Sequence, residues 1–191
     1  MRYVSTRGHP DAVTFSAALA QGLAPDGGLF VPAAFPRFAP EDFAGRETLA
    51  AVGEVLLTPF LADDTLAEHA AAICEDAFAF PVPLEAVDED GALRVLELFH
   101  GPTAAFKDIG ARFLAACLER SAPGAGAQPL LILVATSGDT GGAVAAAFHD
   151  RPGIEVGVLF PRGLVSPRQE QQLTCWGGNV AAFRVDGVFD D

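Results

Sequence analysis

The chain has 191 residues, half of them hydrophobic, and a formal net charge of −13. Such a hydrophobic content excludes an intrinsically disordered chain, and the negative charge argues against nucleic acid or an acidic membrane surface as a partner. Three scattered cysteines, an opening without an apolar signal core and the lack of a long apolar run predict a cytoplasmic protein with neither a metal site nor a membrane span.

The first half of the sequence is predicted to be helix-rich, with an extended opening. The expected elements are a strand over 3–5, a helix over 15–21 capped by Thr14, a turn into a strand over 24–32, and helices over 47–57 and 65–78. Pro81 and Pro83 then interrupt the pattern. We therefore predict a helix-rich N-terminal domain over 1–84 and an α/β domain over 85–191.

In the second half, strands and helices alternate. The expected elements are strands over 92–99, 130–135, 154–160 and 179–185, helices over 106–120, 139–149 and 167–176, and a Gly/Pro loop over 123–129. Continuous aliphatic strands separated by helices indicate βαβ crossovers. We therefore predict the α/β class, with a parallel sheet that helices cover on both faces in a three-layer αβα arrangement.

The end of the sequence resembles a strand, a turn and a helix N-cap with no helix after it. We therefore expect that the natural chain continues beyond Asp191, and a frayed natural terminus is the alternative. If further elements follow, a hydrophobic face should be exposed where they would pack.

Lys107 is the single lysine in a chain whose other basic residues are arginines. An arginine guanidinium stays protonated and cannot act as an amine nucleophile, so this position could need an amine; codon bias is the alternative explanation. Lys107 follows the strand expected to end near Phe99 and lies near a helix start. We therefore expect it at the carboxyl edge of the sheet, in an apolar pocket that favours the neutral amine. Asp108 either caps the helix, which we favour, or pairs with the lysine.

A second candidate site is the turn ATSGDTGG over 135–142, between an expected strand and an expected helix. Backbone N–H groups at a helix start bind anions, glycines allow close approach, and the hydroxyls of Ser137 and Thr140 add donors. The alternative is an ordinary turn in which Asp139 or Thr140 is the N-cap. The turn matches neither a dinucleotide fingerprint nor a P-loop, and Ser137 does not lie in a hydrolase nucleophile elbow.

Further polar residues carry weaker predictions. His100 has no obvious relay partner in the sequence, so we interpret it as a structural or pocket-wall histidine rather than a general base. Arg162, Arg168 and the run over 166–171 indicate a solvated helix start, with an anion contact as the alternative.

Several motifs resemble one enzyme family. Residues 100–108, HGPTAAFKD, look like the pyridoxal-phosphate lysine motif of threonine synthases, and residues 136–141, TSGDTG, match their SGDTG loop. In the opening, Tyr3 and residues 5–8 and 22–32 are similar too. The late stretch from 161–163 through 166–170 to 177–179 is also similar, so the resemblance covers essentially the whole chain. It implies a fold type II enzyme that uses pyridoxal 5'-phosphate to convert O-phospho-L-homoserine and water to L-threonine and phosphate. This β,γ-elimination and replacement is the last step of threonine biosynthesis.

The resemblance also implies roles for individual residues. Lys107 would hold the cofactor covalently and then move protons between substrate carbons. Asp139 would lie on the side of the cofactor's 3-hydroxyl group, and Phe106 would pack near its ring. The residues that would bind the substrate carboxylate over the cofactor are Ser137, Gly138, Asp139, Thr140 and Gly141.

Members of this family are much longer than this chain. Their cofactor-phosphate loop and the residue that faces the pyridine nitrogen lie in the part missing here, so the resemblance implies an N-terminal portion that is inactive by itself. The alternatives are a threonine-synthase-like phospholyase, a non-catalytic small-molecule-binding module and, ranked last, a phosphatase that uses the 136–141 turn. The sequence does not indicate an oligomeric state.

Overall fold

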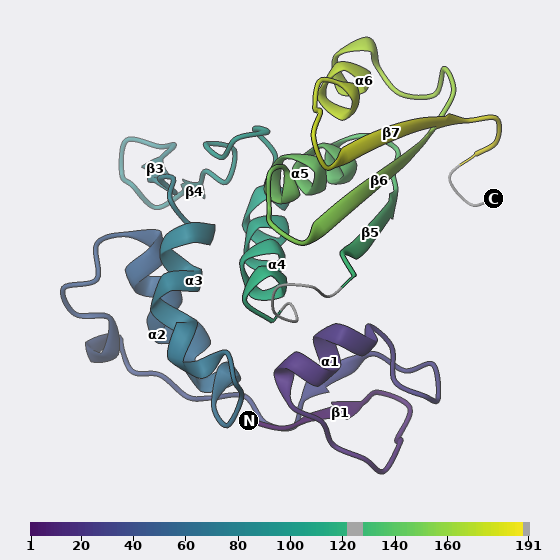
Figure 1. Cartoon of the computed structure of the whole chain (residues 1–191). Coiled ribbons are helices and arrows are strands. Elements are labelled where there is room, and N and C mark those ends of the chain that lie inside the picture. The colour runs from purple at the N-terminus through teal and green to yellow at the C-terminus, as the bar shows by residue number, and fades with distance from the viewer. Residues whose placement is uncertain (122–127, 189–191) are drawn as a thin grey trace. The chain divides into compact units, whose positions relative to one another are not determined.

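Two units of structure divide the chain, Met1–Ala79 and Phe80–Asp191 (Figure 1). The computed structural model describes residues 1–121 and 128–188. The predicted loop over 123–129 lies largely outside the described residues, as does the N-cap expected at the end of the sequence. Within the described ranges, no helix is long and apolar enough to cross a membrane.

The first unit has the helix-rich character that the sequence predicts. Its elements are β1 (Tyr3–Ser5), α1 (Phe15–Gln21), β2 (Phe30–Pro32), η1 (Pro40–Phe43), α2 (Leu49–Leu61), η2 (Ala67–His69) and α3 (Ala70–Ala77). Strands β1 and β2 pair antiparallel. As predicted, Thr14 caps α1, and its hydroxyl accepts a hydrogen bond from the backbone N–H of Ala17 at 3.3 Å.

Helices α2 and α3 pack closely because a glycine lies where they meet. A Cβ atom on Gly53 would lie 2.8 Å from a ring carbon of Phe78, the residue that follows α3. Buried Ile73 and Cys74 of α3 add to this apolar contact region. Tyr3 connects β1 to α2, since its hydroxyl donates to the carbonyl of Phe60 at 3.0 Å.

The second unit contains the parallel sheet that the alternation predicted. Its main elements are α4 (Lys107–Ser121), β5 (Leu130–Ala135), α5 (Asp139–Phe148), β6 (Ile154–Pro161), α6 (Pro167–Thr174) and β7 (Val180–Val185). The strands pair parallel in the order β5-β6-β7, with Val134 opposite Val158 and Val158 opposite Ala182. The α/β class is therefore confirmed.

The core of this unit lies between the helices and one face of the sheet. Its buried members are Ala111, Ala115, Ala143, Ala145, Ala147, Phe148, Ile154, Val156, Val158, Phe160, Leu173 and Val180. Two crossovers connect the strands, one from β5 through α5 to β6 and one from β6 through α6 to β7, and both advance along the sheet in the same direction. Since such crossovers are right-handed, α5 and α6 come to lie over the same face.

The opposite face of the sheet is apolar and exposed. Leu131, Leu133, Phe183 and Val185 are each 41% to 65% exposed, and they alternate with the residues that face the core. The prediction that 130–135 is a buried strand is therefore wrong: Leu130, Leu131, Leu133 and Ala135 are exposed, and Ile132 and Val134 are half-buried, because the described helices of this unit pack against the other face. Within residues 128–188, helices cover one face of the sheet, whereas the sequence predicted helices on both faces.

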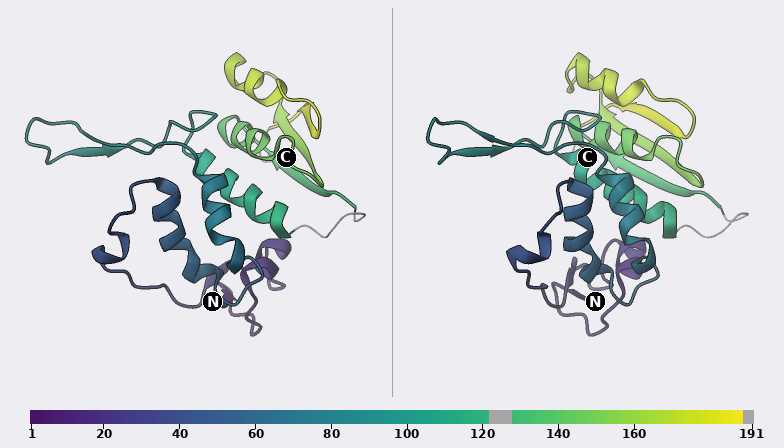
Figure 2. Two further views of the ribbon diagram at one scale, coloured as in Figure 1. Left: turned by 60° about the vertical axis from the view of Figure 1, so that its left-hand side comes forward. Right: turned by 90° about the vertical axis from the view of Figure 1, so that its left-hand side faces the viewer.

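The strand expected over 92–99 belongs to a different sheet. Strand β4 (Arg94–Leu96) pairs antiparallel with β3 (Leu84–Ala86), and Figure 2 shows this hairpin as an arm separate from β5, β6 and β7. This pairing keeps Leu84 in the second unit, so the division falls before the boundary predicted after residue 84. Lys107 was expected at the carboxyl edge of the parallel sheet because a strand precedes it. That reason is wrong, since the preceding strand β4 does not belong to the parallel sheet.

Candidate functional site

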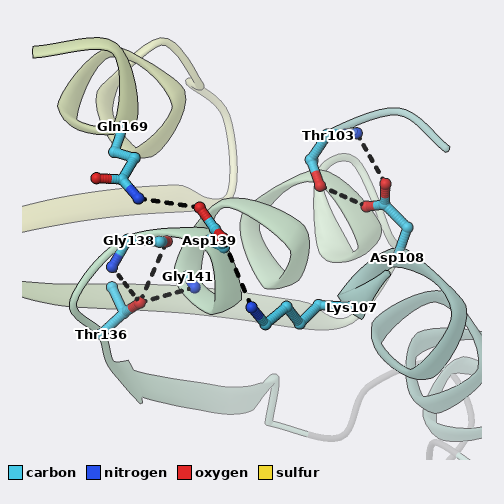
Figure 3. Close-up of polar contacts among 8 residues, drawn as sticks. All are labelled: Thr103, Lys107, Asp108, Thr136, Gly138, Asp139, Gly141 and Gln169. Atoms are coloured by element: carbon cyan, nitrogen blue, oxygen red, sulfur yellow. Dashed lines mark hydrogen bonds and ion pairs between the residues drawn. The ribbon is translucent and has the colours of Figure 1, made fainter. Parts of the chain in front are cut away.

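Lys107 is the first residue of α4, and its amine faces the first residue of α5 (Figure 3). Its Nζ lies 3.5 Å from Oδ2 of Asp139 and 4.6 Å from the centre of the Phe106 ring. The side chain of Lys107 is 31% exposed. Its surroundings thus combine a carboxylate with an aromatic ring, in place of the apolar pocket that the sequence predicted.

Helix packing brings these two residues together. The buried faces of α4 and α5 are rich in alanine, including Ala111 and Ala115 on one helix and Ala143 on the other. Small side chains let the two helices approach closely, and their N-terminal ends then lie side by side (Figure 3). The positive ends of two helix dipoles therefore converge beside the Lys107 amine.

Asp108 fixes the turn that precedes Lys107. Its side chain is fully buried, and its two carboxylate oxygens accept hydrogen bonds from Thr103, from N at 2.9 Å and from Oγ1 at 2.7 Å. A Cβ atom on Gly101 would lie 2.5 Å from Oδ2 of Asp108, so the turn passes directly over the carboxylate. Both roles that the sequence offered for Asp108 are wrong, since it anchors the preceding turn instead of capping the helix or pairing with Lys107.

Thr136 organises the turn at the start of α5. This threonine is buried, and its Oγ1 accepts hydrogen bonds from N of Gly138 at 3.0 Å and from N of Gly141 at 2.9 Å. The N-cap position itself is Gly138, so the prediction of Asp139 or Thr140 as the N-cap is wrong. Asp139 and Thr140 occupy the first two helical positions, where the N–H groups have no acceptor within the helix.

The glycines of this turn make room for the protein's own side chains. A Cβ atom on Gly138 would lie 2.5 Å from Nε2 of Gln169, and one on Gly141 would lie 2.3 Å from Cγ2 of Thr136. Gly138 also has a φ of +152°, which side-chain-bearing residues rarely adopt. The sequence interpretation, in which the glycines leave space for a ligand, therefore needs correction at these two positions. Ser137, between Thr136 and Gly138, is exposed.

The Asp139 carboxylate is shared between two partners. Its Oδ1 accepts a hydrogen bond from Nε2 of Gln169 at 3.0 Å, while Oδ2 faces Lys107. The hydrogen bond from Gln169 is the main cause that lowers the pKa of Asp139 below its usual value. Burial opposes it with the next-largest effect, and the charge of Lys107 again lowers the pKa. Asp139 is thus held as a carboxylate at neutral pH.

The sequence did not reveal that Gln169 contacts Asp139. Its run was interpreted as a solvated helix start, and Ser166 does cap α6, its hydroxyl accepting from N of Gln169. The signal that could have revealed a further role is the capping-box spacing of Ser166 and Gln169, which fixes where the amide lies. Its contact with Asp139 could not be predicted because it depends on how α6 packs beside α5.

Two other side chains singled out in the sequence also have partners. Nε2 of His100 lies 2.6 Å from Oε2 of Glu97, a partner that the sequence did not suggest because residues 97–100 lie in no helix. Nε of Arg162 lies 2.7 Å from Oδ1 of Asp186 in an exposed pair. The Arg162 guanidinium therefore already has a carboxylate partner.

A small apolar cavity of about 200 Å³ lies at the carboxyl end of the sheet. It is lined by Ala135, Thr136, Leu159, Phe160, Pro161, Val185, Gly187 and Val188. Thr136 connects it to the turn at the start of α5. The charged groups that could do chemistry lie at the helix ends, on Lys107 and Asp139, whereas the cavity walls are hydrophobic.

Comparison with known proteins identifies relatives over the whole chain. Residues 2–78 match the family model of the threonine synthase N terminus. The threonine synthase of Escherichia coli is 41% identical over 192 residues, and that of Serratia marcescens is 39% identical over 198 residues. Each match covers 100% of this chain and 44% of the relative.

Solved structures give the same result. The crystal structure of threonine synthase from Escherichia coli superposes with a TM-score of 0.84 at 40% identity and covers 100% of this chain and 44% of that one. A PLP-bound threonine synthase from Brucella melitensis superposes with a TM-score of 0.87 at 39% identity, covering 100% of this chain and 42% of the other. The chain thus spans less than half the length of the relatives it matches.

Proposed function

Since the chain matches the N-terminal part of threonine synthases in sequence and fold, we propose that it supplies the lysine-bearing part of a threonine synthase. The whole protein would convert O-phospho-L-homoserine and water to L-threonine and phosphate. The observation that carries the proposal is the convergence of the Lys107 amine, the Asp139 carboxylate and the start of α5 at one place. The amine is accessible, and it is the single lysine amine of the chain.

The residues at this place fit pyridoxal 5'-phosphate. Lys107 offers a primary amine that can hold the aldehyde covalently, and Phe106 offers an exposed aromatic surface beside it. Asp139, held as a carboxylate, can accept a hydrogen bond from a hydroxyl group of the bound cofactor. When bound, the cofactor supplies an electron sink for negative charge on substrate carbons.

The substrate carboxylate would bind at the start of α5. The N–H groups of Asp139 and Thr140 point out of the first helical turn, and the exposed hydroxyls of Ser137 and Thr140 can add donors. Gly138 and Gly141 keep the turn in the conformation that presents these groups. With the substrate held there, Lys107 would move protons between its carbons as a general acid and base.

The net charge of −13 is compatible with such an anionic substrate. The sequence has no excess of basic residues that would create a general positive field. Binding would therefore depend on local groups, namely backbone N–H donors and the converging positive helix ends. The enzyme would work in the cytoplasm, whose reducing conditions keep cysteines such as the buried Cys74 and Cys117 as thiols.

A direct test of the cofactor role uses the full-length gene product and pyridoxal 5'-phosphate. Reduction with borohydride and peptide mapping should find the cofactor fixed on Lys107. Lys107→Arg is the matched control, because arginine keeps the positive charge but lacks the nucleophilic amine, and it should take no label at this position. Label found on other lysines but absent from Lys107 would refute the assignment.

Product analysis tests the reaction. Full-length protein incubated with O-phospho-L-homoserine should release phosphate and L-threonine in equal amounts. Release of phosphate without threonine would identify a phospholyase, which is the alternative within the same chemistry. A non-catalytic binding module would give a different result. The unaltered protein would form no product, and Lys107→Ala would bind the substrate with unchanged affinity.

A further inference from the structure

We propose that Gln169 is a positioning residue, which holds the Asp139 carboxylate so that one of its oxygens faces the Lys107 amine. The inference rests on the function proposed for Lys107. It concerns a residue on α6, whereas the two groups that it aligns begin α4 and α5.

The orientation of the Gln169 amide is fixed from its own helix. Its Oε1 accepts hydrogen bonds from Oγ of Ser166 at 2.9 Å and from N of Ser166 at 3.2 Å. Since both donors engage the amide oxygen, the amide nitrogen must point the other way. The Ser166–Gln169 capping box therefore determines which end of the amide is presented to α5.

The amide nitrogen then reaches Asp139 (Figure 3). Nε2 of Gln169 donates to Oδ1 of Asp139 at 3.0 Å, and this leaves Oδ2 facing Lys107 at 3.5 Å. The Asp139 side chain is 49% exposed, so without the amide it would be free to rotate into solvent. A hydrogen bond on one oxygen thus sets the direction of the other.

Gly138 provides the space for this contact. A Cβ atom at Gly138 would lie 2.5 Å from Nε2 and 2.7 Å from Cδ of Gln169, so any larger residue would displace the amide. The lowered pKa of Asp139, for which Gln169 is the main cause, supports the same geometry. The SGDTG turn and the start of α6 therefore form one unit.

The test measures how fast Lys107 reacts with a trace amount of an amine-acylating reagent in full-length protein freed of cofactor, with peptide mapping of the product. The Lys107 amine faces the Asp139 carboxylate at 3.5 Å, and this contact makes the amine less available to the reagent. Gln169→Leu releases the carboxylate, so labelling of Lys107 should rise about two- to fivefold, the range expected for loss of a partly exposed ion pair. Gln171→Leu, an exposed glutamine on the same helix, is the matched control and should leave labelling unchanged.

A double-mutant cycle separates positioning from a merely structural role. Asp139→Asn should raise Lys107 labelling by itself, and adding Gln169→Leu to that variant should cause no further change, because Gln169 acts through the carboxylate. Ser166→Ala, which frees the amide oxygen, should act in the same direction as Gln169→Leu but less strongly. If Gln169→Leu fails to fold, the labelling rate of Ser166→Ala tests the inference instead.

Two results would overturn the inference: equal labelling in the unaltered protein and Gln169→Leu, or an effect of Gln169→Leu that persists at full size with Asp139→Asn. Neither readout involves pyridoxal 5'-phosphate. Failure of Lys107 to take the cofactor would therefore refute the proposed function and leave this result standing. A normal cofactor label with an unchanged acylation rate would refute the role of Gln169 alone.

Discussion

The buried carboxylate of Asp108 holds Thr103 by two hydrogen bonds, one to the backbone N–H at 2.9 Å and one to the hydroxyl at 2.7 Å. Lys107 directly precedes Asp108, so these bonds fix the chain on the N-terminal side of the candidate lysine. The position of the amine thus depends on a residue that does not contact it. This arrangement explains why a buried charge is tolerated next to the site, since its oxygens have donors.

Removing the Asp108 carboxylate should destabilise the second unit. Asp108→Ala should lower the free energy of unfolding by about 2 to 3 kcal/mol, because hydrogen bonds to charged groups are lost. Thr103→Val removes the hydroxyl donor but keeps the backbone bond, so its loss should be smaller, about 1 to 2 kcal/mol. Urea unfolding curves measure both, and an Asp108→Ala variant as stable as the unaltered protein would contradict the structure.

Gly53 should resist substitution although it lies inside a helix. Alanine has the higher helix propensity, but its Cβ would lie 2.8 Å from the Phe78 ring, so Gly53→Ala should destabilise the first unit by about 1 to 3 kcal/mol. Gly110 is the matched control, because it lies in α4 and a Cβ there meets nothing within 4 Å. Gly110→Ala should stabilise by up to about 1 kcal/mol. Opposite signs of the two changes in urea unfolding are the expected result.

Tyr3 should titrate at unusually high pH. Burial, with the nearby negative charge of Asp64, raises the pKa of this phenol from 10.0 to about 12. Since the folded pKa lies above the unfolded one, the stabilisation is complete below pH 10.0 and is lost as the pH rises through about 12. Tyr3 is the single tyrosine of the 191-residue chain, so the ultraviolet absorbance of phenolate reports it alone. A midpoint near the usual value in folded protein, equal to that in urea, would show that the phenol is exposed.

The three cysteines should differ sharply in reactivity. Cys175 is exposed, while Cys74 and Cys117 are buried, and burial with the charge of Glu54 raises the pKa of Cys74 to about 11. Since thiolates are the reactive form, dithionitrobenzoate at about pH 8 should modify Cys175 rapidly in the folded chain, and all three cysteines after unfolding in urea. Cys175→Ser should abolish the rapid phase. Rapid modification of Cys74 in folded protein would contradict the packing of α3.

The elements that the sequence predicted well are those whose signals are local. Thr14 caps α1 as expected, and the βαβ alternation gave the parallel sheet over β5, β6 and β7. The strand near residues 94–96 was also expected, but its partner was not. Aliphatic character indicates a strand without indicating which strand it pairs with, so the β3–β4 hairpin was not foreseen.

The candidate site shows the same limit. Residue type and motif selected Lys107 and the turn containing Asp139, because a lone lysine and a glycine-rich helix start carry recognisable chemistry. Nothing along the chain indicated that Gln169 would contact Asp139, since that contact depends on the packing of α6 beside α5. It also offered two wrong roles for Asp108, whose partner Thr103 depends on how the preceding turn folds back.

The sequence by itself therefore determined the Thr14 cap of α1, the alternation of strands and helices and the candidate lysine, because each depends on neighbouring residues along the chain. The tertiary structure decided which side chains share the site. Packing of small alanines between α4 and α5 places Lys107 beside Asp139, and the fit of Gln169 over Gly138 orients the carboxylate. Such contacts join residues far apart in the chain, and only the packed helices bring them within hydrogen-bonding distance.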